Sequence, residues 1–160
     1  MTPFAKLPWE IAGEIIAAIA IAANVVMVIR YWSQLPATVP MHFNIRGQAD
    51  LFGPKITIWI GPAIALACYI LMSFIAKNMG SWNYPVPINQ DNANIQAQIG
   101  LEMLIWMKAE MMVMLVFLEW QVIRVALGKS ETFNVAAIFA MLGLIIATSI
   151  FYLVQALANK

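Results

Sequence analysis

The sequence predicts an all-α membrane protein: four transmembrane helices in one bundle, with an ordered loop between the first and second helices. Hydrophobic residues make up 62% of its 160 residues and charged residues only 11%, whereas about 25% of the residues in a soluble domain are charged. The hydrophobic residues are gathered in four long runs, each long enough to cross a hydrocarbon core about 30 Å thick. Prolines, glycines and polar side chains are concentrated between the first two runs, at residues 31–55.

The four runs form a single expected integral-membrane domain that covers residues 1–160. The second run is interrupted only by Gly61 and Pro62, which would loosen its first turns without preventing a crossing. Glu10 and Glu14 fall where a signal peptide would have a basic region and an uninterrupted apolar core, so we expect the first run to be retained as a span. The expected helices are residues 9–29, 56–76, 101–123 and 133–158.

The loop at residues 31–55 contains the one histidine of the chain, together with turn-forming prolines and glycines. Such residues favour defined turns, which indicates a specified loop and not a floppy connection. We expect this loop to organise the protein and to carry any ligand site. The candidate loop-organising or ligand-binding residues are Pro36, Pro40, His42, Phe43, Asn44, Gly47, Asp50, Gly53 and Lys55.

His42 raises the hypothesis of a divalent metal site, because a neutral imidazole nitrogen is a common zinc ligand. Asp50 could supply an oxygen, and Glu119 could join them from the end of the third span on the same side of the membrane. The spacing matches no established ligand motif such as HExxH. The alternative is structural: His42 and Asn44 bond the loop backbone, while Asp50 pairs with an arginine or lysine of the loop.

Four ionisable residues lie inside the expected spans: Glu14, Lys108, Glu110 and Glu119. A charge near the bilayer centre costs about 2.5 to 3.5 kcal/mol on insertion scales, so each is expected to find a partner. Glu14 and Lys108 lie at similar depths and are expected to pair across the bundle. Glu110 is about 200° from Lys108 around the helix and needs another partner or a proton. The alternatives are helix packing and a proton, ion or ligand pathway.

The loop segment LPATVPMHFNIRGQADLFGPK combines prolines, an HFN triplet, glycines, an aspartate and a lysine in one motif. It resembles the motif of the small membrane proteins grouped as domain of unknown function 1648, a module also found in the N-terminal half of SdpI-type immunity proteins. Two later segments, NYPVPINQDNANIQAQIGLEMLIWMKAE and VFLEWQVIRVALGK, are similar to the second-loop and third-span signatures of the stand-alone members. The resemblance covers residues 35–129.

This resemblance implies a multi-pass protein of the bacterial cytoplasmic membrane without established chemistry. SdpI-type proteins protect against a secreted peptide toxin, but they are longer and contain a further membrane module. The hypothesis that follows is a binding or protective protein, of immunity or stress type, that acts through the HFN-G-D-G-K loop. Its expected partners are the lipid bilayer and either a peptide toxin or other membrane subunits.

Two other classes of function remain open on the sequence. One is a membrane-embedded, metal-dependent hydrolase that uses His42, Asp50 and Glu119 around a divalent ion. The other is an accessory subunit of a larger membrane complex, with the nearly uncharged fourth span as its docking face. A net charge of +1 and the lack of a lysine or arginine run argue against a nucleic-acid partner.

Overall fold

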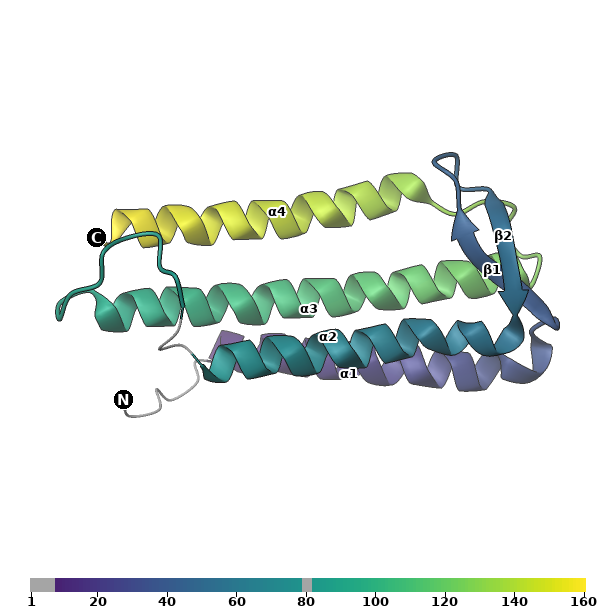
Figure 1. Cartoon of the computed structure of the whole chain (residues 1–160), viewed down its shortest axis with the longest axis horizontal. Helices are drawn as coiled ribbons and strands as arrows, with labels where there is room; N and C mark the ends of the chain where they lie inside the picture. Colours follow the sequence, from purple (N-terminus) through teal and green to yellow (C-terminus); the bar gives the residue numbers. More distant parts are fainter. Residues whose placement is uncertain (1–7, 79–81) are drawn as a thin grey trace.

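The computed structural model describes residues 8–78 and 82–160, and within these residues the chain forms four α-helices and one two-stranded sheet. The helices run lengthwise beside one another, and the sheet lies across one end of them (Figure 1). The helices are α1 (Pro8–Tyr31), α2 (Ile60–Lys77), α3 (Ala93–Ala126) and α4 (Val135–Ala158), and the strands are β1 (Thr38–Phe43) and β2 (Ala49–Pro54).

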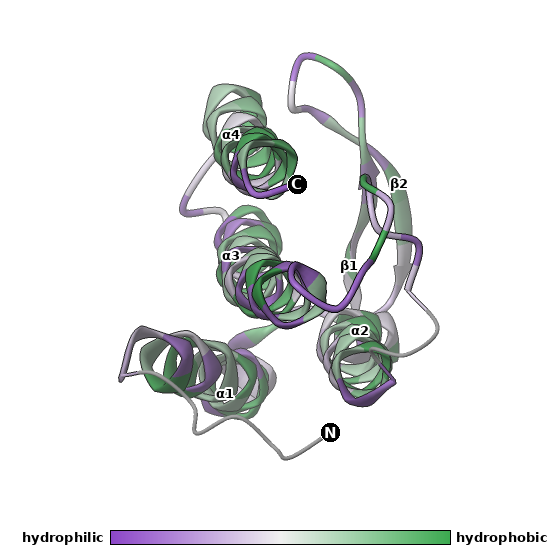
Figure 2. Cartoon of the chain, turned by 90° about the vertical axis from the view of Figure 1, so that its left-hand side faces the viewer, coloured by the Kyte–Doolittle hydropathy of each residue, from purple (hydrophilic) through white to green (hydrophobic). Residues whose placement is uncertain are grey.

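The four expected helices are confirmed, and three helical segments are long and apolar enough to cross a membrane. These segments are Pro8–Gln34, Lys55–Lys77 and Val135–Ala158. The remaining helix, α3, carries more charge but lies between the others (Figure 2) and contacts all three of them. It therefore lies alongside the three apolar helices, and we treat it as a membrane span as well. Its 34 residues include the polar stretch before residue 101, so the helix begins earlier than the expected span.

The arrangement is centred on α3 and is not a symmetric bundle. Helices α1 and α2 pack against each other and against α3, whereas the helix contacts of α4 are chiefly with α3. Viewed along the helices, α4 lies on the opposite side of α3 from α1 (Figure 2). The small residues of the buried core let α1, α2 and α3 approach closely. That core consists of Ala17, Ala20, Ala65, Ala109 and Met112.

The expected ordered loop is a β-hairpin, which adds one small two-stranded sheet to the helical fold that the sequence predicted. Strands β1 and β2 pair antiparallel, with Thr38 opposite Pro54 and Phe43 opposite Ala49. Short 3-10 helices, Trp32–Gln34 and Lys55–Trp59, connect the hairpin to α1 and α2. Apolar residues from the hairpin and its flanks share one buried cluster with the helices, which fixes the hairpin on the bundle. The cluster consists of Val28, Leu35, Val39, Ile58 and Ile123.

Candidate binding site beneath the β-hairpin

The turn of the hairpin is built around Asn44. Its side-chain Oδ1 accepts hydrogen bonds from the backbone N–H groups of Arg46, at 2.9 Å, and Gln48, at 3.1 Å. Its backbone carbonyl accepts a third, from the Gly47 N–H at 2.8 Å. Gly47 has a φ of +76°, a conformation that favours glycine because it has no Cβ. The HFN and glycine parts of the motif therefore specify a turn.

The turn is attached to the loop between α3 and α4 at Phe133. The Phe133 N–H donates to the Gly47 carbonyl at 2.7 Å, and a Cβ on Gly47 would collide with the Phe133 backbone. The rings of Phe43 and Phe133 pack with their centroids 4.5 Å apart. The hairpin tip therefore contacts a segment about 85 residues later in the chain. This is a tertiary contact, because the two segments are too far apart in sequence to belong to one local turn.

His42 and Asp50 face each other across the two strands. His42 Nδ1 lies 2.6 Å from Asp50 Oδ1, and their side chains are 64% and 44% exposed. Asp50 thus pairs with histidine and not with the expected arginine or lysine. Lys55 instead places its ammonium 4.6 Å from the centre of the Trp32 ring. An exposed pair of this kind contributes little to stability.

The expected three-ligand metal set does not assemble. His42 and Asp50 lie on the exposed side of the hairpin, while Glu119 is buried against α2. Among residues 8–78 and 82–160, no group of three histidine, cysteine, aspartate or glutamate side chains could hold a metal ion. The Glu119 side chain faces Gly61 of α2 and not His42 and Asp50, so the three predicted ligands do not converge.

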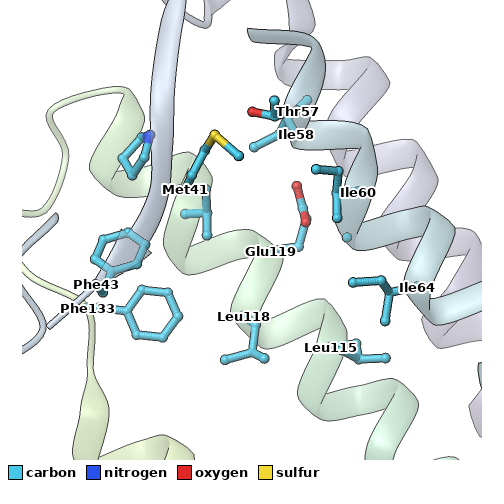
Figure 3. A pocket seen from close by; sticks show the side chains of 13 residues that line it. Met41, Phe43, Thr57, Ile58, Ile60, Ile64, Leu115, Leu118, Glu119 and Phe133 are labelled. Carbon is cyan, nitrogen blue, oxygen red and sulfur yellow. The ribbon is translucent and has the colours of Figure 1, made fainter. Parts of the chain in front are cut away.

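A cavity of about 320 Å³ lies between the hairpin, α2 and α3. We call it the hairpin cavity. In Figure 3, Met41 and Phe43 of β1 form one wall, Ile60 and Ile64 of α2 form another, and the Glu119 carboxylate lies between them. The lining is almost wholly apolar. It comprises Pro40, Met41, Phe43, Thr57, Ile58, Ile60, Gly61, Ile64, Leu115, Leu118, Glu119, Val122 and Phe133.

Glu119 is the one ionisable side chain in the lining of the hairpin cavity. It is 5% exposed, and among the described residues its Oε1 has no hydrogen-bond partner. Its Oε2 lies where a Cβ on Gly61 would stand, so the glycine creates the space for the carboxylate. A buried ionised carboxylate without a partner costs several kcal/mol. A cation or a hydrogen-bond donor in the cavity would remove that cost.

The predicted intramembrane pair of Glu14 and Lys108 is present. Lys108 Nζ lies 2.8 Å from both carboxylate oxygens of Glu14 and donates to Ser73 Oγ at 3.2 Å. The same ammonium lies 4.8 Å from the centre of the Tyr69 ring. Lys108 is thereby bound to α1 and α2 together, and this explains how a 1% exposed lysine is accommodated among apolar helices. Its role is to fix helix packing.

Glu110 points away from Lys108, as its position on the helix predicted. It accepts a hydrogen bond from Thr148 Oγ1 of α4 at 2.6 Å. Near the other end of the helices, Gln98 Nε2 donates to Glu10 and, at 3.0 Å, to Glu102. Sequence reasoning missed Ser73, Thr148 and Gln98 as partners. For Ser73 and Thr148, the signal was a hydroxyl within a long apolar run at the level of an ionisable residue on a neighbouring helix.

The fold and the cavity define a helical membrane protein with a hairpin-covered pocket at one end of its helices. Residues 18–66 match the family described as Domain of unknown function (DUF1648), which supports the resemblance that the loop motif indicated. The match runs from α1 through the hairpin into α2, so it includes the cavity walls from β1 and α2 but not the residues of α3, among them Glu119. No curated protein and no solved structure matches the chain.

Proposed function

We propose that the protein is a membrane-embedded binding protein that holds an amphipathic ligand in the hairpin cavity. The observation that carries this proposal is the buried Glu119 carboxylate, which has no partner among the described residues although the rest of the lining is apolar. The ligand is an apolar molecule with one cationic group. Its apolar part packs against β1, α2 and α3, and its polar group meets Glu119.

The size of the hairpin cavity limits what can enter. A volume of about 320 Å³ is at the lower end of the roughly 300 to 1,000 Å³ found for small-molecule pockets. It fits one headgroup with part of an alkyl chain, or one long side chain of a peptide, while the remainder of the ligand stays in the bilayer. A peptide that inserts a lysine would be bound in this way, and its capture would give the protein a protective role.

The two alternatives from the sequence receive less support. A metal-dependent hydrolase needs a ligand set, and Glu119 is separated from His42 and Asp50. An accessory subunit would use the outer face of α4, but lipid would cover that face equally well. The hairpin cavity is the more specific feature, because it combines an apolar lining with one buried carboxyl group that has no hydrogen-bond partner among the described residues.

The test uses two photoreactive dodecyl probes, an amine and the matching alcohol, with the full chain in lipid nanodiscs. We expect the amine to label the cavity wall more strongly than the alcohol, with adducts on the peptide that contains Leu118. Glu119→Gln keeps the size of the side chain but removes its charge, so amine labelling should fall about tenfold, equivalent to about 1.4 kcal/mol. An amphipathic peptide with one lysine should compete with the amine if the natural ligand is a peptide.

Glu110→Gln is the matched control, because Glu110 is also a carboxylate of α3 but bonds to Thr148 outside the cavity. It should leave labelling by both probes unchanged. Equal labelling by amine and alcohol in the wild type, or an equal loss in the two variants, would contradict the proposal.

A further inference from the structure

A second pocket lies on the other side of Phe133 from the hairpin cavity. It has a volume of about 480 Å³ and is called the interfacial pocket here. We propose that it binds a phosphate group, carried either by a phospholipid headgroup or by a free phosphate ion. The pocket is formed by the hairpin turn, one face of α3 and the loop before α4. Its lining comprises Arg46, Phe117, Trp120, Gln121, Arg124, Ser130, Thr132, Phe133, Asn134 and Val135.

The charge of the interfacial pocket suits an anion. Arg46 and Arg124 both line it, and among the described residues no acidic side chain does so. Arg124 is held in place, with its guanidinium 4.7 Å from the centre of the Trp120 ring and one Nη2 hydrogen bond to the Lys129 carbonyl at 3.3 Å. An arginine fixed in this way still has N–H groups to offer, and the guanidinium geometry matches phosphate oxygens.

Gln121 gives an independent indication of a ligand. It lines the interfacial pocket, is 3% exposed, and its Nε2 amide has no acceptor among the described residues. Leaving a buried amide donor unsatisfied costs about 1 to 3 kcal/mol, which a phosphate oxygen would remove. Gln121 is about 200° around α3 from Glu119, so the two side chains lie on opposite faces of this helix. A group that bonds to Gln121 therefore cannot also bond to Glu119.

The start of α4 adds to the positive potential. Val135, the first residue of this 24-residue helix, lines the pocket, and a helix N-terminus carries about half a positive charge. The Asn134 side chain already accepts from the Ala137 N–H at 3.0 Å. The helix therefore contributes its dipole, while the arginines and Gln121 contribute the hydrogen bonds.

The two sources of phosphate differ in their apolar part: a phospholipid carries acyl chains next to the phosphate, and a free phosphate ion does not. The hairpin and the loop before α4, which contribute to the pocket, lie at one end of the helices (Figure 1). Trp120 in the lining is 39% exposed, and tryptophan is enriched at the headgroup level of a membrane. A phospholipid would lay its acyl chains along Phe117 and Trp120, whereas a free phosphate ion would use the polar residues alone.

The experiment is native mass spectrometry of the full chain in a neutral detergent with three probes: phosphatidylglycerol, diacylglycerol and inorganic phosphate. The variants are Arg46→Gln, which alters an exposed side chain of the turn, and Gln121→Met, which removes the buried amide at similar size. Arg30→Gln is the control. Arg30 is an exposed arginine in the last turn of α1, before the hairpin, and it does not line the pocket. Glu119→Gln should leave phosphate binding unchanged, which separates this proposal from the preceding one.

Retention of phosphatidylglycerol but not diacylglycerol, lowered about tenfold by both variants and not by Arg30→Gln, would support a lipid headgroup as the source. Inorganic phosphate bound with the same dependence on the variants, without lipid retention, would support free phosphate. Equal retention of the two lipids would overturn the proposal. So would the lack of binding of any probe to the wild type, or variants that behave as the control does.

Discussion

Gly47 is subject to two constraints that separate cleanly in this chain. Its backbone has a positive φ, and its Cα lies against the Phe133 backbone, so a side chain has neither a relaxed conformation nor space. Gly128 has a similar φ of +66°, but a Cβ there would meet nothing within 4 Å. A comparison of substitutions at Gly47 and Gly128 therefore separates two losses of stability. One comes from the backbone conformation, and the other from the contact between the hairpin and Phe133.

We therefore expect Gly47→Ala to lower the thermal stability of the detergent-solubilised protein more than Gly128→Ala does. The Gly128 variant should lose roughly 1 to 2 kcal/mol, the usual cost of a left-handed conformation for a residue with a Cβ. The Gly47 variant should lose more, because its Cβ would also displace Phe133. Equal shifts in the unfolding midpoint of the two variants would show that the contact with Phe133 contributes nothing to stability.

Residue types and depth were readable from the sequence, but side-chain direction was only partly so. Glu14 and Lys108 were paired by depth, and the structure confirms them. Glu119 was grouped with His42 by the same reasoning, yet it faces Gly61. The position of a residue in the sequence gives its height along the helix axis. It does not give the direction in which the side chain points, unless a second residue on the same helix fixes the rotation of that helix.

Among the elements, α3 is the one to which the others are joined by polar contacts. Lys108 reaches α1 and α2, and Glu110 reaches α4 through Thr148. Polar contacts of this kind are weak in total energy but specific in geometry. They fix which face of α3 each neighbouring helix contacts.

The Glu14–Lys108 pair should behave as a unit in a double-mutant cycle. Glu14→Gln leaves the buried Lys108 ammonium without its carboxylate, at a cost of about 3 to 5 kcal/mol. Lys108→Met should cost less, because the Glu14 side chain that remains is 22% exposed. The double variant should be more stable than the sum of the two losses predicts, as measured by unfolding in detergent. Lys108→Met combined with Glu110→Gln is the control and should be additive, since Glu110 bonds elsewhere. Additive losses for both combinations would contradict the coupling.

The helices were predictable from the sequence because long apolar runs leave few alternatives in a bilayer. The hairpin was not, although its turn residues were recognised. A strand is recognised by a period of two, and here prolines and a register shift between Pro40 and His42 break that period. Pro40 also lacks the N–H that a strand interior normally uses, which suits an edge strand.

In the whole molecule, the hairpin and the loop before α4 lie at one end, while the end of α4 lies at the other (Figure 1). The chain crosses the membrane four times only if α3 also spans it, and α3 carries more charge than the three apolar spans. The two cavities adjoin at Phe133, which lines both of them, so both proposed sites belong to one side of the membrane.

This topology can be checked by labelling introduced cysteines with a membrane-impermeant maleimide, in a Cys68→Ala background that removes the native thiol. We expect Ile45→Cys, in the hairpin turn, and Glu131→Cys, before α4, to react from the same side of sealed vesicles. Lys160→Cys should react only from the opposite side. Opposite labelling of the first two positions would mean that α3 does not cross the membrane.

The pairing of Glu14 with Lys108 also has a consequence for synthesis of the chain. The two residues are 94 positions apart, which at about 5 to 20 residues per second corresponds to roughly 5 to 20 s of translation. During that interval α1 holds a carboxylate whose lysine partner has not yet been made. The first helix therefore either waits beside the insertion machinery or enters the bilayer with that carboxylate unneutralised by lysine, and the arrival of α3 ends its exposure.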